Sequence, residues 1–269
     1  MKKLLLFLLV VVSIPSIAQK GLDEMIAAER SFAAYAVANN TKDAFLKYMD
    51  SGAVMFENGE PYKAYERWQK REKRPGVLSW WPLYAEIAAS GDFGYTCGPW
   101  TFQPTSITDS VVANGFFFTI WQKNKAGEWK FILDVGTDQG RFLPGDTILI
   151  RVKPGKTPDS KLGMLGAEKD FVEMNGSNPS EANKLFAAEN IIYAREKTTL
   201  MGQVKSSEPP GSLSSEKMSF IPLGSGIAPS GDLGYIYGTA TLNGKKETYL
   251  RIWRHEPSGW KIALQMVRL

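Results

Sequence analysis

A tyrosine and a glutamate at two-residue spacing are the first side chains in this sequence that could do chemistry. Tyr84 and Glu86 alternate along one strand predicted over residues 80–88, so both side chains would lie on the same face of it. A carboxylate so placed can take a proton from a carbon beside a carbonyl, while the phenol hydrogen-bonds the developing oxyanion. The alternative is a solvent-facing glutamate beside a packing tyrosine, which the usual surface preference of glutamate favours.

Asp134 is the third candidate catalytic residue, close to the end of a strand predicted over residues 129–135. The sequence allows two interpretations of it. Asp134 could project into a pocket, or it could form the turn before Gly136. Strict alternation along the strand places it opposite one apolar face, so that it points away from the interior if that face fills the interior. This face comprises Trp129, Phe131, Leu133 and Val135.

Aromatic residues concentrate on the predicted strands and are candidates for binding an apolar ring. The candidates are Trp80, Trp81, Tyr95, Trp100, Phe117 and Trp121. Aromatic side chains at strand positions are more often simply core, and this alternative stays open.

Glu29 and Glu168 each interrupt the apolar face of a predicted helix. A carboxylate in such a position costs free energy unless it is paired. Because the arrangement occurs in both parts of the chain, we expect these carboxylates to be structural acceptors for backbone or tryptophan N–H groups.

The composition argues against several other classes of site. The 269 residues include one cysteine and one histidine, which excludes a cysteine-rich zinc site and makes a nucleophilic triad improbable. No spacing indicates a metal site or a phosphate-binding loop, so we expect neither a metal nor a cofactor. The net charge of +4 is small and dispersed, which does not favour nucleic acid or an acidic membrane as a partner.

Residues 1–18 have the pattern of a secretory signal peptide. Lys2 and Lys3 precede an apolar run over 4–12, and small residues follow at 16–18. We therefore expect an exported protein, periplasmic or secreted, whose mature chain starts at Gln19 and is not held in a membrane. Cys97 would then be a lone thiol in an oxidising compartment, where burial is the usual arrangement.

The chain contains the same pattern twice. Residues 78–98 align without a gap on residues 218–238, with 11 of 21 positions identical. Further along, the triplet 119–121 parallels 251–253, and 127–130 parallels 258–261. Such internal similarity is typical of a repeated structural unit.

Each unit starts with helical periodicity and continues with strand alternation, which predicts an α+β class with antiparallel strands. Asn243 and Gly244 have the composition of a tight type I′ hairpin turn. We expect one domain over 19–143, a linker over 144–160 that includes a short strand near 147–152, and a second domain over 161–269. Helices within the first domain are expected near 43–48 and 62–73.

In this order, the motifs resemble the SnoaL-like, DUF4440-type branch of the NTF2-like superfamily. The resemblance rests on AERSF at 28–32, ASGDFGYTCGPW at 89–100 and the strand at 129–136. It implies two tandem cones, each a strongly bent sheet wrapped around helices with a pocket at its open end. Trp81 departs from the polar residue expected at its position, and the second copy is more diverged.

The second copy lacks the polar groups of the first. Gly224, Gly226 and Gln265 stand where the first copy has Tyr84, Glu86 and Asp134. We therefore expect a pseudo-dimer within one chain, in which the second unit is degenerate and covers apolar surface of the first.

Three functions stay open at this point. The first is a binding module for a small apolar or aromatic molecule, without catalysis. The second is a cofactor-free isomerase, dehydratase or cyclase of the kind found in the superfamily, with a pocket carboxylate as base. The third is a scaffold whose filled cones only present a surface to a partner protein.

Overall fold

The computed structural model describes residues 17–138, 150–152, 159–196, 198–204 and 217–269. The predicted signal peptide lies outside these residues except for Ile17 and Ala18, which begin the first helix. Of the predicted linker, residues 150–152 form a short strand, which confirms the strand expected there. We call residues 17–152 the N-terminal half and residues 159–269 the C-terminal half.

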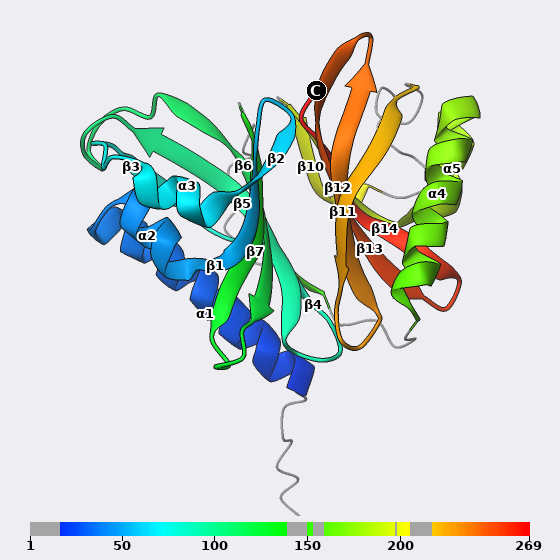
Figure 1. The fold of residues 1–269 in the computed structure, drawn as a ribbon, viewed down its shortest axis with the longest axis horizontal. Coiled ribbons are helices and arrows are strands. Elements are labelled where there is room, and N and C mark those ends of the chain that lie inside the picture. The colour runs from blue at the N-terminus through cyan, green and yellow to red at the C-terminus, as the bar shows by residue number, and fades with distance from the viewer. Residues whose placement is uncertain (1–16, 139–149, 153–158, 197, 205–216) are drawn as a thin grey trace, which may run out of the picture.

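The N-terminal half is three helices and a curved sheet of eight strands (Figure 1). The sheet order is β2-β1-β7-β6-β5-β4-β8, with β3 paired to β5. The expected strand over 80–88 is divided at Pro82, which cannot donate to a ladder. The elements are α1 (Ile17–Ala38), α2 (Thr41–Tyr48), β1 (Met49–Glu57), β2 (Glu60–Lys63), α3 (Ala64–Lys70), β3 (Val77–Trp80), β4 (Tyr84–Ile87), β5 (Phe93–Gln103), β6 (Ala113–Lys123), β7 (Trp129–Asp138) and β8 (Ile150–Val152).

The C-terminal half has two helices and a sheet in the order β10-β9-β14-β13-β12-β11. In the N-terminal half β1 pairs in parallel with β7, and in the C-terminal half β9 pairs in parallel with β14. Asn243 and Gly244 have φ values of 50° and 80°, which confirms the predicted turn. The elements are α4 (Lys161–Ser177), α5 (Pro179–Phe186), β9 (Ala187–Arg195), β10 (Thr198–Val204), β11 (Ser219–Ile227), β12 (Leu233–Leu242), β13 (Lys245–Glu256) and β14 (Gly259–Val267).

Each sheet has one face toward its own helices and the other toward the opposite half (Figure 1). The cluster between the sheets takes buried side chains from both halves, for example Phe118 and Leu133 together with Ile252 and Leu264. The backbone N–H of Ser90 also donates to Oγ of Ser230, its counterpart in the repeat, at 3.0 Å. The two halves therefore share one apolar layer, because neither sheet could expose that face to water without large cost.

A β-bulge in β7 decides which side chains face the helices. β6 pairs Trp121 with Phe131 but Ile120 with Leu133, so Ile132 is the extra residue. Phe131 consequently packs in the helix-side core, whereas Leu133 lies between the sheets. Strict alternation was therefore the wrong assumption for Asp134, which faces the helix side like Phe131.

Candidate functional site

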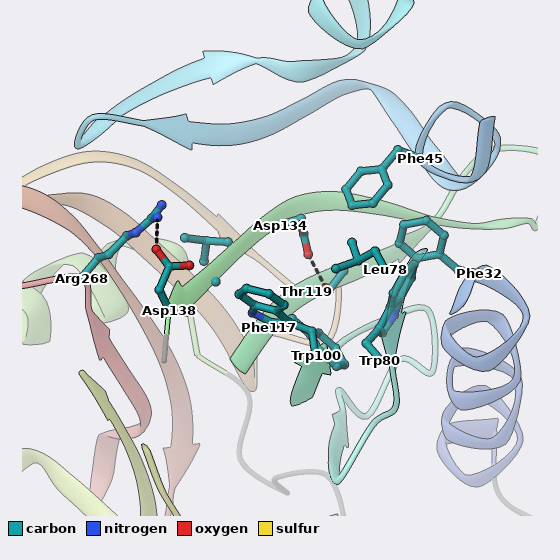
Figure 2. A pocket seen from close by; sticks show the side chains of 12 residues that line it. Phe32, Phe45, Leu78, Trp80, Trp100, Phe117, Thr119, Asp134, Asp138 and Arg268 are labelled. Atoms are coloured by element: carbon teal, nitrogen blue, oxygen red, sulfur yellow. Dashed lines mark hydrogen bonds and ion pairs between the residues drawn. The ribbon is translucent and has the colours of Figure 1, made fainter. Parts of the chain in front are cut away.

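A pocket of about 250 Å³ opens on the helix side of the N-terminal sheet (Figure 2). Five of its twelve lining residues are aromatic, and they come from α1, α2, β3, β5 and β6. The lining residues are Phe32, Phe45, Leu78, Trp80, Trp100, Phe117, Thr119, Asp134, Val135, Gly136, Asp138 and Arg268. The volume is below the range of about 300–1,000 Å³ usual for drug-sized ligands, which favours a small molecule.

Asp134 is the carboxyl group at the centre of this pocket. It pairs across the strands with Thr119, whose hydroxyl donates to Oδ1 at 2.6 Å (Figure 2). Burial raises the pKa of Asp134 to about 7, the hydrogen bond from Thr119 lowers it, and the nearby Glu29 raises it further. The group can therefore carry or release a proton near neutral pH, which is the property that acid–base chemistry requires.

Glu29 on α1 holds two of the tryptophans in place behind the pocket. It is fully buried and accepts hydrogen bonds from Trp80 Nε1 at 2.6 Å and from Trp121 Nε1 at 2.9 Å, as well as from the Thr96 hydroxyl. These bonds confirm that it is an acceptor for tryptophan N–H groups. Burial raises the pKa of Glu29 and these donors lower it, so it responds to the same low-dielectric surroundings as Asp134.

The rim of the pocket is shared by both halves. Arg268 follows β14 in the C-terminal half and donates from Nη2 to Asp138 Oδ2 on β7, at 3.1 Å (Figure 2). The two side chains are 32% and 50% exposed, so this ion pair is partly solvated. The second half therefore contributes a residue to the site of the first.

Tyr84 and Glu86 lie together, as their spacing predicts, but on the opposite side of the sheet from Asp134. Both are buried in the layer between the two halves. Glu86 accepts from the Tyr95 hydroxyl at 2.8 Å and from Arg254 Nη1 at 2.8 Å. The alternative of a solvent-facing Glu86 was wrong, because the cation that makes its burial possible comes from the other half of the chain.

The Tyr84 phenol is held protonated in this setting. Burial raises its pKa first, and the charge of Glu86 raises it further. Tyr84, Tyr95 and Glu86 therefore form a hydrogen-bonded group that does not line the pocket. The structure brings these predicted residues together and separates them from Asp134.

The six aromatic candidates divide by position. Trp80, Trp100 and Phe117 line the pocket, and Trp121 is fully buried behind it. Tyr95 lies between the sheets, and Trp81 is 37% exposed in the segment between β3 and β4. The expected burial of Cys97 is confirmed.

Sequence reasoning missed several residues of the pocket. They are Phe32, Phe45, Leu78, Thr119, Asp138 and Arg268. The repeat carried a signal for Thr119, since the matching position holds Arg251, a change from a small polar group to a long cation. No signal could have identified Arg268, because only the packing of the halves brings it to the rim.

The corresponding interior of the C-terminal half is filled. Arg251 matches Thr119, is 0% exposed, and forms an ion pair with Glu168, the counterpart of Glu29. Its Nε donates to Gln265 Oε1 at 2.8 Å, where the first half has Asp134. The guanidinium also lies 3.9–4.6 Å from the ring centres of Phe171, Phe220 and Tyr249.

Two kinds of feature are not found in the described part of the chain. None of its helices is long and apolar enough to cross a membrane. Among the same residues, no three His, Cys, Asp or Glu side chains are grouped so that they could hold a metal ion.

Comparison with known proteins gives similar folds without a function. No family model matches the chain, and no curated protein matches it. An NTF2-like protein from Cytophaga hutchinsonii is 16% identical, with 41% of this chain and 98% of that chain covered and a TM-score of 0.33.

Two further solved structures are of the same kind. An NTF-2 like protein of unknown function from Shewanella oneidensis is 16% identical over 43% of this chain and 98% of its own, with a TM-score of 0.34. A DUF4783 family protein from Bacteroides uniformis is 14% identical over 41% and 96%, with a TM-score of 0.31. Likeness at this level carries no argument about activity, which has to come from the site.

Proposed function

We propose that the N-terminal half binds a small, largely apolar molecule in its pocket, with Asp134 as the polar anchor. The observation that carries this proposal is a carboxyl group with a raised pKa, facing a cavity whose walls are mostly apolar and include five aromatic side chains. Pockets for small ligands have this composition, in which apolar walls supply affinity and a few polar groups fix orientation.

A second candidate is proton transfer on the bound molecule, in an isomerase, dehydratase or cyclase of the kind the NTF2-like resemblance implies. The pKa of about 7 favours it, because a general base works best near the operating pH. Since Tyr84 and Glu86 do not line the pocket, this candidate places the proton transfer on Asp134, with Thr119 as the hydrogen-bonding neighbour.

For the C-terminal half we propose a structural role. Its interior is occupied by Arg251, and its sheet covers the apolar face of the first sheet. In this proposal the two halves are the diverged tandem cones of an intramolecular pseudo-dimer. The interaction-scaffold hypothesis then applies to the second half rather than to the pocket. We also propose export to the periplasm or the medium, on the basis of the N-terminal sequence.

The binding proposal is tested on the exported protein isolated from its own cells. Native mass spectrometry before and after denaturation should show a small molecule released at about one per chain. A fragment screen by ligand-observed NMR should find small apolar compounds that bind the wild type and not Thr119→Arg, a change that fills the pocket.

Thr108→Arg is the matched control, because Thr108 is exposed in the loop between β5 and β6. Fragments that bind both variants and the wild type equally, together with a bare chain mass, would overturn the binding proposal. If a substrate is found, turnover that survives Asp134→Asn would exclude the proton-transfer candidate.

A further inference from the structure

The charges that line the pocket are unbalanced. Among the lining residues the structure describes, the charged side chains are Asp134, Asp138 and Arg268. Arg268 and Asp138 are paired at the rim, at 3.1 Å. Asp134, deeper in the pocket, accepts a hydrogen bond from the Thr119 hydroxyl, and none of these described lining residues pairs it with a cation.

The aromatic wall supplies a second, independent preference. Phe32, Phe45, Trp80, Trp100 and Phe117 surround the cavity, with Asp134 among them (Figure 2). The face of an aromatic ring carries negative charge density, so a cage of such rings attracts a cation, and most strongly one that has lost its water. An ammonium group with small alkyl substituents satisfies both the rings and the carboxylate.

The C-terminal half holds a cation of its own among aromatic rings and a carboxylate. There a cation, Arg251, sits over three aromatic rings and contacts the carboxylate of Glu168. In the N-terminal half aromatic rings and the matching carboxylate Glu29 are kept, and Asp134 stands in place of Gln265. Thr119 in place of Arg251 leaves the space of the cation open.

We infer, resting on the proposed function, that the ligand of the N-terminal pocket is a small organic cation whose ammonium group is enclosed by the aromatic side chains and faces Asp134. The alternative is an anion bound by Arg268. An anion would have to draw Arg268 away from Asp138, and it would approach the carboxyl groups of Asp134 and Glu29.

Binding of a cation in this pocket should depend on pH through Asp134. Around Asp134 stand Glu29 from α1, Thr119 from β6, Asp138 from β7 and Arg268 after β14. A bound cation favours the ionised form of Asp134, so its affinity should rise as the pH passes upward through the pKa of about 7. A neutral ligand of the same shape should show no such rise.

Three isosteric probes test this on the full mature chain by NMR titration of the tryptophan indole resonances. They are choline, neutral 3,3-dimethylbutan-1-ol and anionic 3,3-dimethylbutanoate. At pH 8 we expect choline to bind at least about tenfold more tightly than the neutral probe, and the anion to bind most weakly. At pH 5.5 the advantage of choline should fall to within about twofold.

Asp134→Asn should abolish the preference for choline at pH 8 while the neutral probe still binds. Asp170→Asn is the matched control, because Asp170 is exposed on α4 of the other half. A neutral or anionic probe that binds as tightly as choline would overturn the inference and leave the proposed binding function standing. Failure of all three probes to shift the indole resonances would overturn the inference, whereas the fragment screen above tests the binding function separately.

Discussion

The two halves of the chain place matching residues in matching registers, yet one interior is open and the other is closed. β6 pairs Thr119 with Asp134, and β13 pairs Arg251 with Gln265. The side chain of Arg251 is buried in the interior of the second half, at the register position where Thr119 lines the 250 Å³ pocket of the first. One side chain at one register position thus separates a candidate binding site from a structural core.

The two halves also differ in the partners of their matching buried carboxylates, Glu168 and Glu29. Glu168 is balanced by a cation, whereas Glu29 is met by neutral donors, and burial raises its pKa. A buried charge without a counterion is costly, and such cost is tolerated most often at functional sites. The unbalanced half is the one that has the pocket.

The largest effect is expected from opening the closed half. Arg251→Thr should destabilise the protein by about 3–5 kcal/mol, because it leaves Glu168 buried without its counterion and creates a cavity. Urea unfolding would measure this loss. Arg251→Met, which keeps most of the volume, should lose less; equal losses would show that the missing counterion, not the cavity, dominates.

Breaking the ion pair between Glu86 and Arg254, which joins the two halves, should also lower the stability of the protein. Glu86→Gln should cost up to about 3 kcal/mol of stability, since the largely buried Arg254 would lose one of its two carboxylate partners and keep Glu256. The affinity of 3,3-dimethylbutan-1-ol for the pocket should stay within about twofold. A large change in affinity with no change in the urea midpoint would return Glu86 to the list of site residues.

Replacing Asp134 by an amide makes the first half resemble the second at this position. The pKa of about 7 lies above the ordinary value of 3.8, so the folded state keeps a proton that the unfolded chain loses between about pH 4 and 7. Stability should therefore fall as the pH rises through this interval. Asp134→Asn should stabilise the protein by up to about 4 kcal/mol at pH 8 and have no effect below pH 4.

The pH dependence of urea unfolding would check this. An Asp134→Asn curve that still falls between pH 4 and 7 would assign the titration to Glu29, the other buried carboxyl nearby.

Closing the open half is the complementary change. Thr119→Arg places a guanidinium beside Asp134 and Glu29, as Arg251 lies beside Gln265 and Glu168. Binding of 3,3-dimethylbutan-1-ol should weaken at least about tenfold, which is about 1.4 kcal/mol. Unchanged affinity would show that the probe binds elsewhere.

The smallest effect is expected at the rim. Asp138→Asn breaks the partly exposed pair with Arg268, and such pairs contribute about 0–1 kcal/mol, less at high salt. Unfolding at low and high salt would measure it. A loss well above 1 kcal/mol would indicate that the pair holds the two halves in register.

The sequence by itself determined the repeat, the α+β class, the hairpin turn at Asn243 and Gly244, and the structural role of Glu29. These features follow from local periodicity, from the φ values a turn requires, and from the cost of burying an unpaired carboxylate. It also identified Asp134, Trp80 and Trp100, which line the pocket.

Only the tertiary structure decided which of the candidate residues line the pocket. The bulge at Ile132 turned Asp134 into the pocket, against the strict alternation of the strand. Packing of the second sheet buried Tyr84 and Glu86, because Arg254 supplied a cation for the Glu86 carboxylate. The same packing brought Arg268 to the rim of the pocket. Bulges and contacts between distant segments depend on the packing of whole sheets, which the period of a single strand does not encode.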